Sequence, residues 1–357
     1  MAEKPKLLGI TGNIASGKSV VRQYLENEGA LTIDADLLAQ ETYLPGNPAY
    51  QPILDTFGSD ICYSDGQINR SKLGRIVFRE PSALAELEAI VHPQVTLSIE
   101  KILDRAQTQL VVVEAIKLFE ANLHLRCDQV WAVVADDQVR QERLMITRGL
   151  SEEDALTRIH SQNPQEEKAA RAHYVVHTDT SFEFTYTQTI QGLKNLLPKH
   201  SYDIPVTPDE TYQPLRPAYF NTVREVFNHY FSETWTDEYA FHTLSQRSVL
   251  IGIKGDTLTS MASWKIDHFL GLVHNIIPCA PNSEETEQSI HALEHSAKDH
   301  LCNALFLPHD IISPKKAKLF GYMPGEYYPS NLNAVALTNF LRRHGYMPGE
   351  VYLKTQF

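Results

Sequence analysis

The sequence predicts an α/β protein in which a parallel sheet, covered by helices on both faces, is followed by a second, smaller α+β domain. Its 357 residues exceed the usual size of one domain and favour two. In the first half, short apolar runs alternate with helical stretches, which is typical of parallel strands buried on both faces. Five prolines then fall within residues 198–217, a composition typical of a linker.

The first half holds five predicted strands, which are the apolar runs 6–10, 31–34, 109–113, 130–134 and 174–176. A helix is predicted over 19–28 because its apolar residues recur at helical spacing. A long, mostly helical insertion covers 37–105, and a charged helical stretch covers 140–172. We therefore expect one domain over 1–200 and a linker over 201–213.

The second domain is expected over 214–357. Its predicted elements are a helix (217–231), three strands (249–253, 259–266 and 272–277), a helix (285–301), a strand (304–307), a helix (332–344) and a last strand (350–354). The hexapeptide Gly-Tyr-Met-Pro-Gly-Glu occurs at 321–326 and again at 345–350. Two copies are too few for a stacked repeat protein, so we interpret them as two similar turns after two helices.

Composition excludes several classes of function. Lys and Arg number 32 against 44 Asp and Glu, a net charge of −12 that disfavours nucleic-acid binding. No apolar run is long enough to cross a bilayer, and the first residues do not resemble a secretory signal. The four cysteines lie far apart without a C-x-x-C pair, which favours a reducing cytoplasm. We expect a cytoplasmic protein with no membrane or nucleic-acid partner; its oligomeric state stays open.

A phosphate-binding loop follows the first predicted strand. The motif G-x-x-x-x-G-K-[ST] is matched throughout by Gly12, Asn13, Ile14, Ala15, Ser16, Gly17, Lys18 and Ser19. Because the loop opens a helix, backbone N–H groups and the positive end of the helix dipole converge on one anion. The two glycines let the chain approach phosphates closely. We expect Lys18 to reach the β- and γ-phosphates of ATP, and the Ser19 hydroxyl to bind Mg²⁺.

A series of further motifs follows this loop along the chain. The segment 33–39 is I-D-A-D-L-L-A, and later matches are Pro45-Gly46, Phe57-Gly58, Asp65-Gly66, Asn69-Arg70, His92-Pro93, Leu118-Phe119-Glu120, Arg143 and Arg148. In this order they make residues 6–195 resemble the dephospho-CoA kinases. The resemblance implies a P-loop kinase with a helical insertion and a lid. It also implies transfer of the ATP γ-phosphoryl group, with Mg²⁺, to the ribose 3′-hydroxyl of dephospho-CoA, the last step of coenzyme A synthesis.

The resemblance also assigns roles to individual residues. Asp36 would orient or deprotonate the acceptor hydroxyl, although it could instead cap the helix that starts at Leu37. Arg143 and Arg148 would act on the phosphates from a helix and lid, or else lie on a solvated helix face. His92 would bind the acceptor within the insertion, or be an ordinary hydrogen-bonded histidine. Asp34 is expected to have a structural role.

Three segments depart from the family pattern. Gln40 stands where the family has an arginine, and Lys117 stands where an apolar residue is usual. Near the expected adenine site, Thr178 and Thr180 replace an asparagine and a glycine. These changes keep open a kinase for another small hydroxyl or nucleotide acceptor. A non-catalytic sensor of nucleotide or CoA is the alternative from a different class.

The second domain resembles GNAT-type N-acetyltransferases in the order of its elements and in the helix-then-Gly-aromatic ending over 336–346. The pyrophosphate loop of that family is absent, and the acidic stretch 279–285 stands in its place. Acetyltransferase activity therefore does not follow; an acyl-CoA-using transferase, a docking module and a stabilising appendage stay open. His291, Glu294 and His295 match H-x-x-E-H, which we interpret as a polar helix face rather than a zinc site.

Overall fold

The computed structural model describes residues 4–197, 211–230, 236, 243, 247–254, 257–267, 270–277, 283–326 and 334–355. They belong to two compact units. Unit 1 comprises Met1–Lys18, Gly29–Gln141 and Ser151–Asp179, and unit 2 comprises Ser19–Glu28, Glu142–Leu150 and Thr180–Phe357. The chain thus passes from one unit to the other within two helices, α1 and α6, as well as near residue 180.

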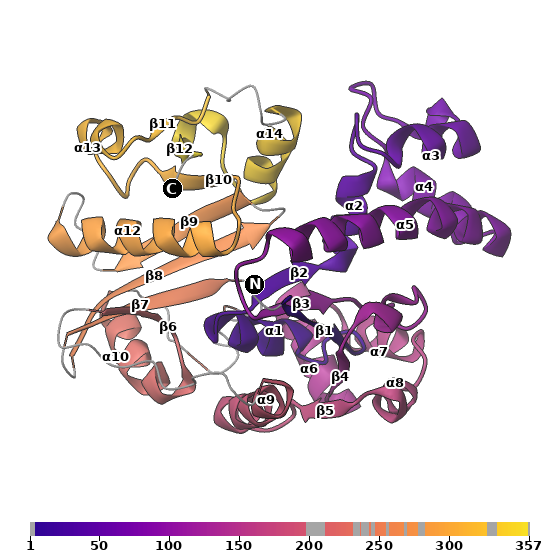
Figure 1. Cartoon of the computed structure of the whole chain (residues 1–357), viewed down its shortest axis with the longest axis horizontal. Coiled ribbons are helices and arrows are strands. Elements are labelled where there is room, and N and C mark those ends of the chain that lie inside the picture. Colours follow the sequence, from indigo (N-terminus) through magenta and orange to yellow (C-terminus); the bar gives the residue numbers. More distant parts are fainter. Residues whose placement is uncertain are drawn as a thin grey trace. The chain divides into compact units, whose positions relative to one another are not determined.

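Unit 1 is built on a parallel sheet of five strands in the order β2-β3-β1-β4-β5 (Figure 1). Its strands are β1 (Lys6–Thr11), β2 (Leu31–Asp34), β3 (Leu110–Glu114), β4 (Gln129–Val134) and β5 (Tyr174–His177). All neighbouring strands pair in parallel. The predicted fold class and its five strands are confirmed. Nearly every residue of β1, β3 and β4 is buried, as expected for strands covered on both faces.

The insertion after β2 is helical, as predicted. It contains α2 (Ala35–Thr42), α3 (Tyr50–Phe57), a 3₁₀ turn (Ser59–Ile61), α4 (Arg70–Val77) and α5 (Pro81–Arg105). Two of these helices begin with a side-chain N-cap, Asp34 for α2 and Asn69 for α4. Asp and Asn are among the residues preferred at this position. The long helix α5 packs against α2 and α4 (Figure 1).

Three helices and one further turn complete the first half of the chain before α9. They are a 3₁₀ turn (Leu123–Arg126), α6 (Asp137–Arg148), α7 (Glu152–His160) and α8 (Gln165–Arg171). The charged stretch predicted as helical is thus divided into three helices. Ser151 caps the second of them, α7, by accepting from the N–H of Asp154, and Pro164 precedes α8 without a side-chain cap.

Unit 2 contains a seven-stranded mixed sheet in the order β11-β12-β10-β9-β8-β7-β6. The strands are β6 (Thr211–Pro214), β7 (Ser248–Lys254), β8 (Thr257–Asp267), β9 (Leu270–Ile277), β10 (Ala304–Pro308), β11 (Met323–Pro324) and β12 (Val351–Lys354). Strands β9 and β10 are parallel, and the other pairs are antiparallel. The predicted second α+β domain is confirmed in its order of elements.

The helices of unit 2 cover both faces of this sheet. They are α1 (Lys18–Asn27), α9 (Phe182–Leu196), α10 (Phe220–Tyr230), α12 (Glu284–Asp299), α13 (Pro314–Leu319) and α14 (Ala334–Arg343), with 3₁₀ turns at Pro217–Tyr219 and Pro348–Glu350. On β7, Val249 and Ile251 pack with α10, whereas Leu250 packs with α12. Since side chains alternate along a strand, α10 and α12 lie on opposite faces.

Three short elements differ from the prediction. Strand β6 begins at Thr211, within the stretch expected as linker. It forms because Thr211–Pro214 pair antiparallel with β7, and the prolines of this stretch had favoured a linker instead of a strand. The rest of the expected linker lies outside the described residues. Helix α13 and strand β11 have six and two residues, which is too short for a periodic pattern in the sequence.

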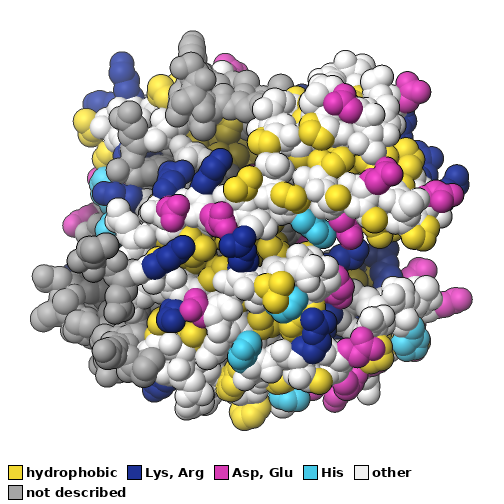
Figure 2. Space-filling model, turned by 45° about the vertical axis from the view of Figure 1, so that its right-hand side comes forward, with side chains coloured by type: hydrophobic (Ala, Val, Ile, Leu, Met, Phe, Trp, Pro, Cys, Tyr) yellow, Lys and Arg dark blue, Asp and Glu magenta, His cyan; other side chains and the backbone are white. Residues whose placement is uncertain are grey.

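The surface mixes residue types. On the face shown in Figure 2, Lys and Arg side chains are interspersed with Asp and Glu, and hydrophobic side chains reach the surface between them. The most exposed large apolar residues are Phe78, Leu319 and Leu125. Within the described part of the chain, no helix combines the length and the apolar character that a membrane span requires.

The two copies of the hexapeptide each begin with a turn after a helix, as predicted, but they then differ: Met323–Pro324 of the first copy form β11, whereas Pro348–Glu350 of the second form a 3₁₀ turn. Gly321 follows α13 and Gly345 follows α14, and both adopt positive φ angles, +81° and +84°. Glycine is favoured at this position after a helix because an L side chain there strains the backbone.

We expect Gly321→Ala and Gly345→Ala each to lower the free energy of unfolding by about 1 kcal/mol. The added Cβ opposes a left-handed backbone, whereas it meets nothing at Gly345 and only an ordinary contact with Lys354 Cε, 3.9 Å away, at Gly321. Gly74→Ala is the matched control: Gly74 lies inside α4 with ordinary helical φ, so alanine should leave stability unchanged or raise it. Urea unfolding monitored by circular dichroism measures all three. Equal effects at the three positions would contradict this account of the turns.

Candidate active site

A loop and two carboxylate side chains of unit 1 lie at one edge of the parallel sheet, because they follow or end strands whose carboxyl ends meet there. The loop Gly12–Lys18 follows β1, Asp34 ends β2, and Glu114 ends β3. Strand β3 lies between β1 and β2, with Asp34 paired beside Glu114. In open parallel sheets this edge is where ligands bind.

Both loop glycines are required by close packing. A Cβ on Gly12 would collide with the carbonyl oxygen of Val133 and lie 2.7 Å from Ser16 Oγ. Gly17 has a φ of +87°, and its Cβ would lie 2.8 Å from Thr178 Oγ1. The sequence predicted the glycines from their approach to phosphates; the structure adds that the protein itself leaves no room for a side chain there.

Hydrogen bonds from α6 and from the segment between α7 and α8 hold the middle of the loop. The Ile14 N–H donates to Gln162 Oε1 at 2.7 Å, and the Ile14 carbonyl accepts from Arg140 Nε at 3.0 Å. Asn13 Nδ2 donates to the Asn163 carbonyl at 2.7 Å. No local sequence pattern predicts these contacts of Arg140 and Asn163, because each joins residues more than a hundred positions apart.

The end of the loop is held by Thr178, directly after β5. Its hydroxyl is buried and donates to the Ser16 carbonyl at 2.7 Å. This is the position where the sequence departs from the asparagine of the resembled family. A threonine here therefore supports the loop through its hydroxyl and packs against Gly17.

Two buried oxygen atoms of the loop have no hydrogen-bond partner, Asn13 Oδ1 and Ser16 Oγ. A buried polar atom without a partner is unfavourable, so it commonly marks a place where a ligand or water binds. Together with the backbone amides of the loop, these atoms fit the binding of a polar, anionic group.

Lys18 is the buried cation of the site. Lys18 is only 7% exposed, and its Nζ donates a hydrogen bond to the Asn13 carbonyl at 3.1 Å. Burial lowers the pKa of Lys18, while the carboxylates of Glu114, Asp36 and Asp34 act in the opposite direction. The ammonium thus lies among negative charges contributed by β3, β2 and α2.

Asp36 and Asp34 have different surroundings and different roles. Asp34 Oδ1 accepts from the N–H groups of Asp36 and Leu37, both at 3.0 Å, so Asp34 is the cap of α2. The alternative that Asp36 caps this helix is therefore wrong. Desolvation by neighbouring atoms raises the pKa of Asp36, the Asp34 charge raises it further, and Lys18 lowers it. A backbone hydrogen bond from Ile116 also lowers its pKa, so the Asp36 carboxylate contacts the segment that follows β3.

A second lysine approaches the same carboxylate. Lys168 of α8 is buried, and its Nζ donates to the Ile116 carbonyl at 2.7 Å. Burial lowers the pKa of Lys168, whereas Glu120 and Asp36 raise it. Asp36 therefore lies within electrostatic reach of two ammonium groups.

The structure gives the following positions for the other predicted site residues. Ser19 is the second residue of α1 and belongs to unit 2, as do Arg143 and Arg148. Arg148 is exposed and Arg143 is half-buried on α6. His92 is half-buried on α5, and its carbonyl accepts from the Thr96 hydroxyl. The roles of these four residues stay predictions.

The other two departures from the family pattern also have local partners. Gln40 Oε1 accepts a hydrogen bond from Arg70 Nη1, so a guanidinium from α4 adjoins the position where the family has an arginine. Lys117 forms an exposed ion pair with Glu88 at 3.4 Å. Neither change leaves an uncompensated buried charge.

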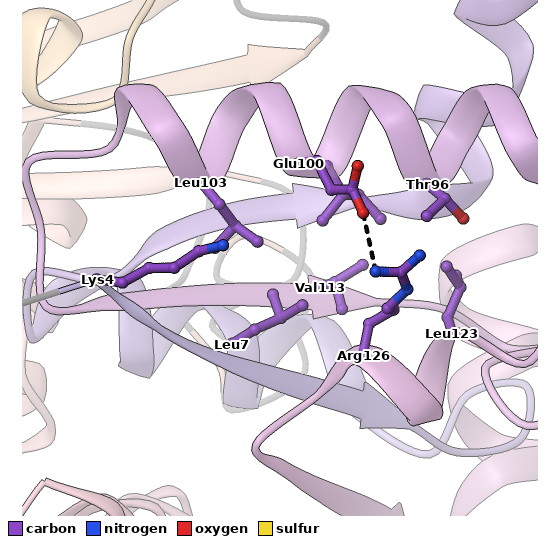
Figure 3. Close-up of a pocket in the computed structure, with 9 residues that line it drawn as sticks. Lys4, Leu7, Thr96, Glu100, Leu103, Val113, Leu123 and Arg126 are labelled. Carbon is purple, nitrogen blue, oxygen red and sulfur yellow. Dashed lines mark ion pairs between the residues drawn. The ribbon is translucent and has the colours of Figure 1, made fainter.

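A separate small cavity lies between α5 and the sheet of unit 1 (Figure 3). It has a volume of about 100 Å³ and includes none of the loop residues 12–18. Leu7, Val113 and Leu103 give it an apolar lining, and Arg126 pairs with Glu100 beside it at 2.9 Å. Sites for ligands of nucleotide size are several times larger.

Among the described residues, no group of three or more His, Cys, Asp or Glu side chains could hold a metal ion. His291 lies 3.6 Å from Glu294, and His295 lies 3.6 Å from Asp299, along the same helix. The two histidines are exposed, as expected for a polar helix face, whereas Glu294 is buried and also pairs with Lys354 at 2.9 Å.

The strand–loop–helix unit, the buried Lys18 and the carboxylates at the sheet edge define a P-loop phosphotransferase. A family model described as dephospho-CoA kinase matches residues 6–183. The dephospho-CoA kinase of Carboxydothermus hydrogenoformans is 40% identical over 191 residues, which are 53% of this chain and 93% of that protein. That of Geobacter sulfurreducens is 43% identical over 173 residues, 48% of this chain and 88% of the relative. The chain belongs to the dephospho-CoA kinase family and is an ATP-dependent phosphotransferase.

Two solved structures are similar to parts of this chain. TT1252 from Thermus thermophilus is 33% identical with a TM-score of 0.49, covering 55% of this chain and 99% of that chain. A probable acetyltransferase from Staphylococcus epidermidis is 11% identical with a TM-score of 0.28, covering 42% of this chain and all of that chain (100%).

Two substitutions in the loop test its backbone geometry, one that adds a Cβ at a left-handed position and one that removes a Cβ from such a position. Gly17→Ala should abolish ATP binding, because Cβ would strain a left-handed φ and push against Thr178. Ala15 already has a φ of +57°, a region where glycine is unstrained, so Ala15→Gly should keep ATP binding within about threefold. Isothermal titration with ATP measures both. Loss of binding in Ala15→Gly, or retention in Gly17→Ala, would contradict the loop geometry.

Proposed function

We propose that this chain transfers the γ-phosphoryl group of Mg·ATP to the ribose 3′-hydroxyl of dephospho-CoA, producing coenzyme A and ADP. The bond between the β,γ-bridging oxygen and the γ-phosphorus breaks, a bond from the 3′-oxygen to that phosphorus forms, and the hydroxyl proton leaves. The observation that carries this proposal is that the loop Gly12–Lys18 after β1 and the start of α2 after β2 lie at the same edge of the parallel sheet, where the Lys18 ammonium and the Asp36 carboxylate interact electrostatically. This arrangement supports one site for a phosphate donor and a hydroxyl acceptor.

Residues 12–19 serve the donor. The loop amides bind the phosphates, and Lys18 Nζ neutralises charge that accumulates on the β- and γ-phosphates as the bond breaks. The Ser19 hydroxyl would hold Mg²⁺, which when bound supplies charge neutralisation between the β- and γ-oxygens. The unpartnered Asn13 Oδ1 and Ser16 Oγ support a loop made for a polar ligand.

Asp36 serves the acceptor. Its carboxylate accepts a hydrogen bond from the 3′-hydroxyl, which directs the oxygen lone pair toward the phosphorus, and it takes the proton late in the reaction. His92 of the insertion binds the acceptor. Arg143 and Arg148 stabilise the transferring group from the lid and exclude water.

Residues 1–200 are proposed as the catalytic domain, 201–213 as a connection and 214–357 as an accessory domain. We further propose that the protein works in a reducing cytoplasm. Cys62, Cys127 and Cys302 are free thiols, and burial raises the pKa of Cys127 to about 12, which keeps that thiol protonated and unreactive.

Asp36→Asn should lower kcat by about 10²- to 10⁴-fold with little change in the KM for ATP, because the acceptor loses its base. In the wild type, kcat/KM should fall as the pH drops through the raised pKa of Asp36, since protonation removes the hydrogen-bond acceptor. Asp34→Asn keeps a helix cap but removes a like charge, so this acid limb should move to lower pH. An unchanged pH profile in Asp34→Asn would contradict the electrostatic assignment.

Arg70, which bonds Gln40, is proposed to bind the acceptor in place of the arginine that the family has at position 40. We expect Arg70→Ala to raise the KM for dephospho-CoA about tenfold or more, because a charged hydrogen-bond donor is lost. The KM for ATP should not change. Arg75→Ala, which removes an exposed arginine of the same helix, is the control. A proportional rise of both KM values in Arg70→Ala argues against an acceptor contact.

The alternative functions are separated by measuring ADP release with different acceptors. Turnover with dephospho-CoA that Lys18→Ala abolishes is the expected result. Turnover with nucleoside monophosphates but not with dephospho-CoA would assign another acceptor. ATP binding without any turnover would assign a nucleotide sensor.

A further inference from the structure

Helix α1 buries polar side chains as well as its apolar face. Gln23, Glu26, Asn27 and the following Glu28 are only 3%, 7%, 6% and 9% exposed, although a surface helix normally leaves such residues in water. The residues that cover them come from the C-terminal part of unit 2. The polar face of α1 is therefore an internal docking surface.

The central contact is the hydroxyl of Ser248, the first residue of β7. It lies between two α1 side chains: Gln23 Nε2 donates to Ser248 Oγ at 3.0 Å, and Ser248 Oγ donates to Glu26 Oε1 at 2.6 Å. One turn further, Asn27 Nδ2 donates to the Leu215 carbonyl at 2.9 Å. All three bonds are buried, so removing one partner leaves the other without a replacement from solvent.

Charged groups continue this surface at the end of α1. Glu28 accepts from the Tyr186 hydroxyl at 2.7 Å and pairs with Arg216 at 3.2 Å. His300 Nε2 lies 3.7 Å from Glu26 Oε1. Because each buried carboxylate has partners from several elements, the angle and register of α1 are fixed with respect to the C-terminal sheet.

The other end of the same helix carries the phosphate ligands. Helix α1 begins at Lys18, followed by Ser19, and Glu26 lies about 12 Å further along the helix axis. A two-turn helix is stiff, so a shift at Glu26 is passed to the Lys18 and Ser19 amides. Electrostatic binding of phosphates is sensitive to small displacements of such donors.

We propose that the C-terminal domain is a positioning partner for the ATP site: Ser248 and the Leu215 carbonyl hold α1 in the orientation that phosphate binding requires. This inference rests on the proposed function for the identity of the reaction, but its central claim is about nucleotide binding alone. By linkage, ATP binding and the α1 contact strengthen each other by the same factor.

The test uses the full-length chain with Ser248→Ala and Asn27→Asp. Both should raise the Kd for AMP-PNP and the KM for ATP by about three- to tenfold, with the KM for dephospho-CoA unchanged. Ser248→Thr, which keeps the hydroxyl, should restore most of the affinity. The control is Ser260→Ala, which removes a buried hydroxyl of the same sheet that bonds Tyr212 instead of α1.

The outcomes are distinct. Wild-type Kd values in both variants would overturn the proposal, and so would a loss of thermal stability shared with Ser260→Ala without a change in Kd. If either variant fails to fold, the other decides. Absence of turnover with dephospho-CoA in the wild type would contradict the proposed function, whereas AMP-PNP titration still decides this inference.

Discussion

The burial of the Lys18 ammonium among carboxylates is the interaction on which the site depends. A buried cation is tolerated only where negative charge and hydrogen-bond acceptors surround it. Here Glu114, Asp34 and Asp36 supply that charge, and the Asn13 carbonyl accepts from Nζ. These groups meet only because β1, β2 and β3 run parallel and end at the same edge. The sheet topology is therefore a requirement of the electrostatics as much as of packing.

The same charges explain why two neighbouring aspartates differ. Asp34 accepts hydrogen bonds from two N–H groups of the first turn of α2, which hold its carboxylate in place. Asp36, two residues later, has its pKa raised by burial and by the Asp34 charge, and it also accepts a backbone hydrogen bond from Ile116. The role proposed for Asp36 as the base therefore depends on these surrounding charges, whereas Asp34 caps the helix.

Local patterns predicted most of the fold. The apolar runs and the complete loop motif were sufficient for the five parallel strands, for Gly12 to Lys18, and for the order of elements in the C-terminal sheet. The contacts of Arg140, Gln162 and Thr178 with the loop were not predictable. Each depends on tertiary proximity between distant segments, and Thr178 even departs from the pattern of the family that the sequence resembles. Nor could periodicity show that the polar side of α1 is buried, since those residues read as an ordinary solvent face.

The two ends of helix α1 thus make different kinds of contact. Its first residues belong to the phosphate-binding motif shared with the family, and its later polar residues contact Ser248 and Leu215, which lie beyond residues 6–183 matched by the family model. A domain attached at such a helix can stabilise the family's reaction without touching the substrate. This is a physical reason why a kinase and an α+β domain can share one chain.

The central claim, that the loop and Asp36 direct phosphoryl transfer to one particular hydroxyl, is tested most directly by phosphorus NMR of the product formed from ATP and dephospho-CoA. The account predicts a new phosphomonoester signal on the ribose 3′-oxygen, together with stoichiometric ADP. A phosphate on any other oxygen, or ADP formed without a new ester, would contradict it.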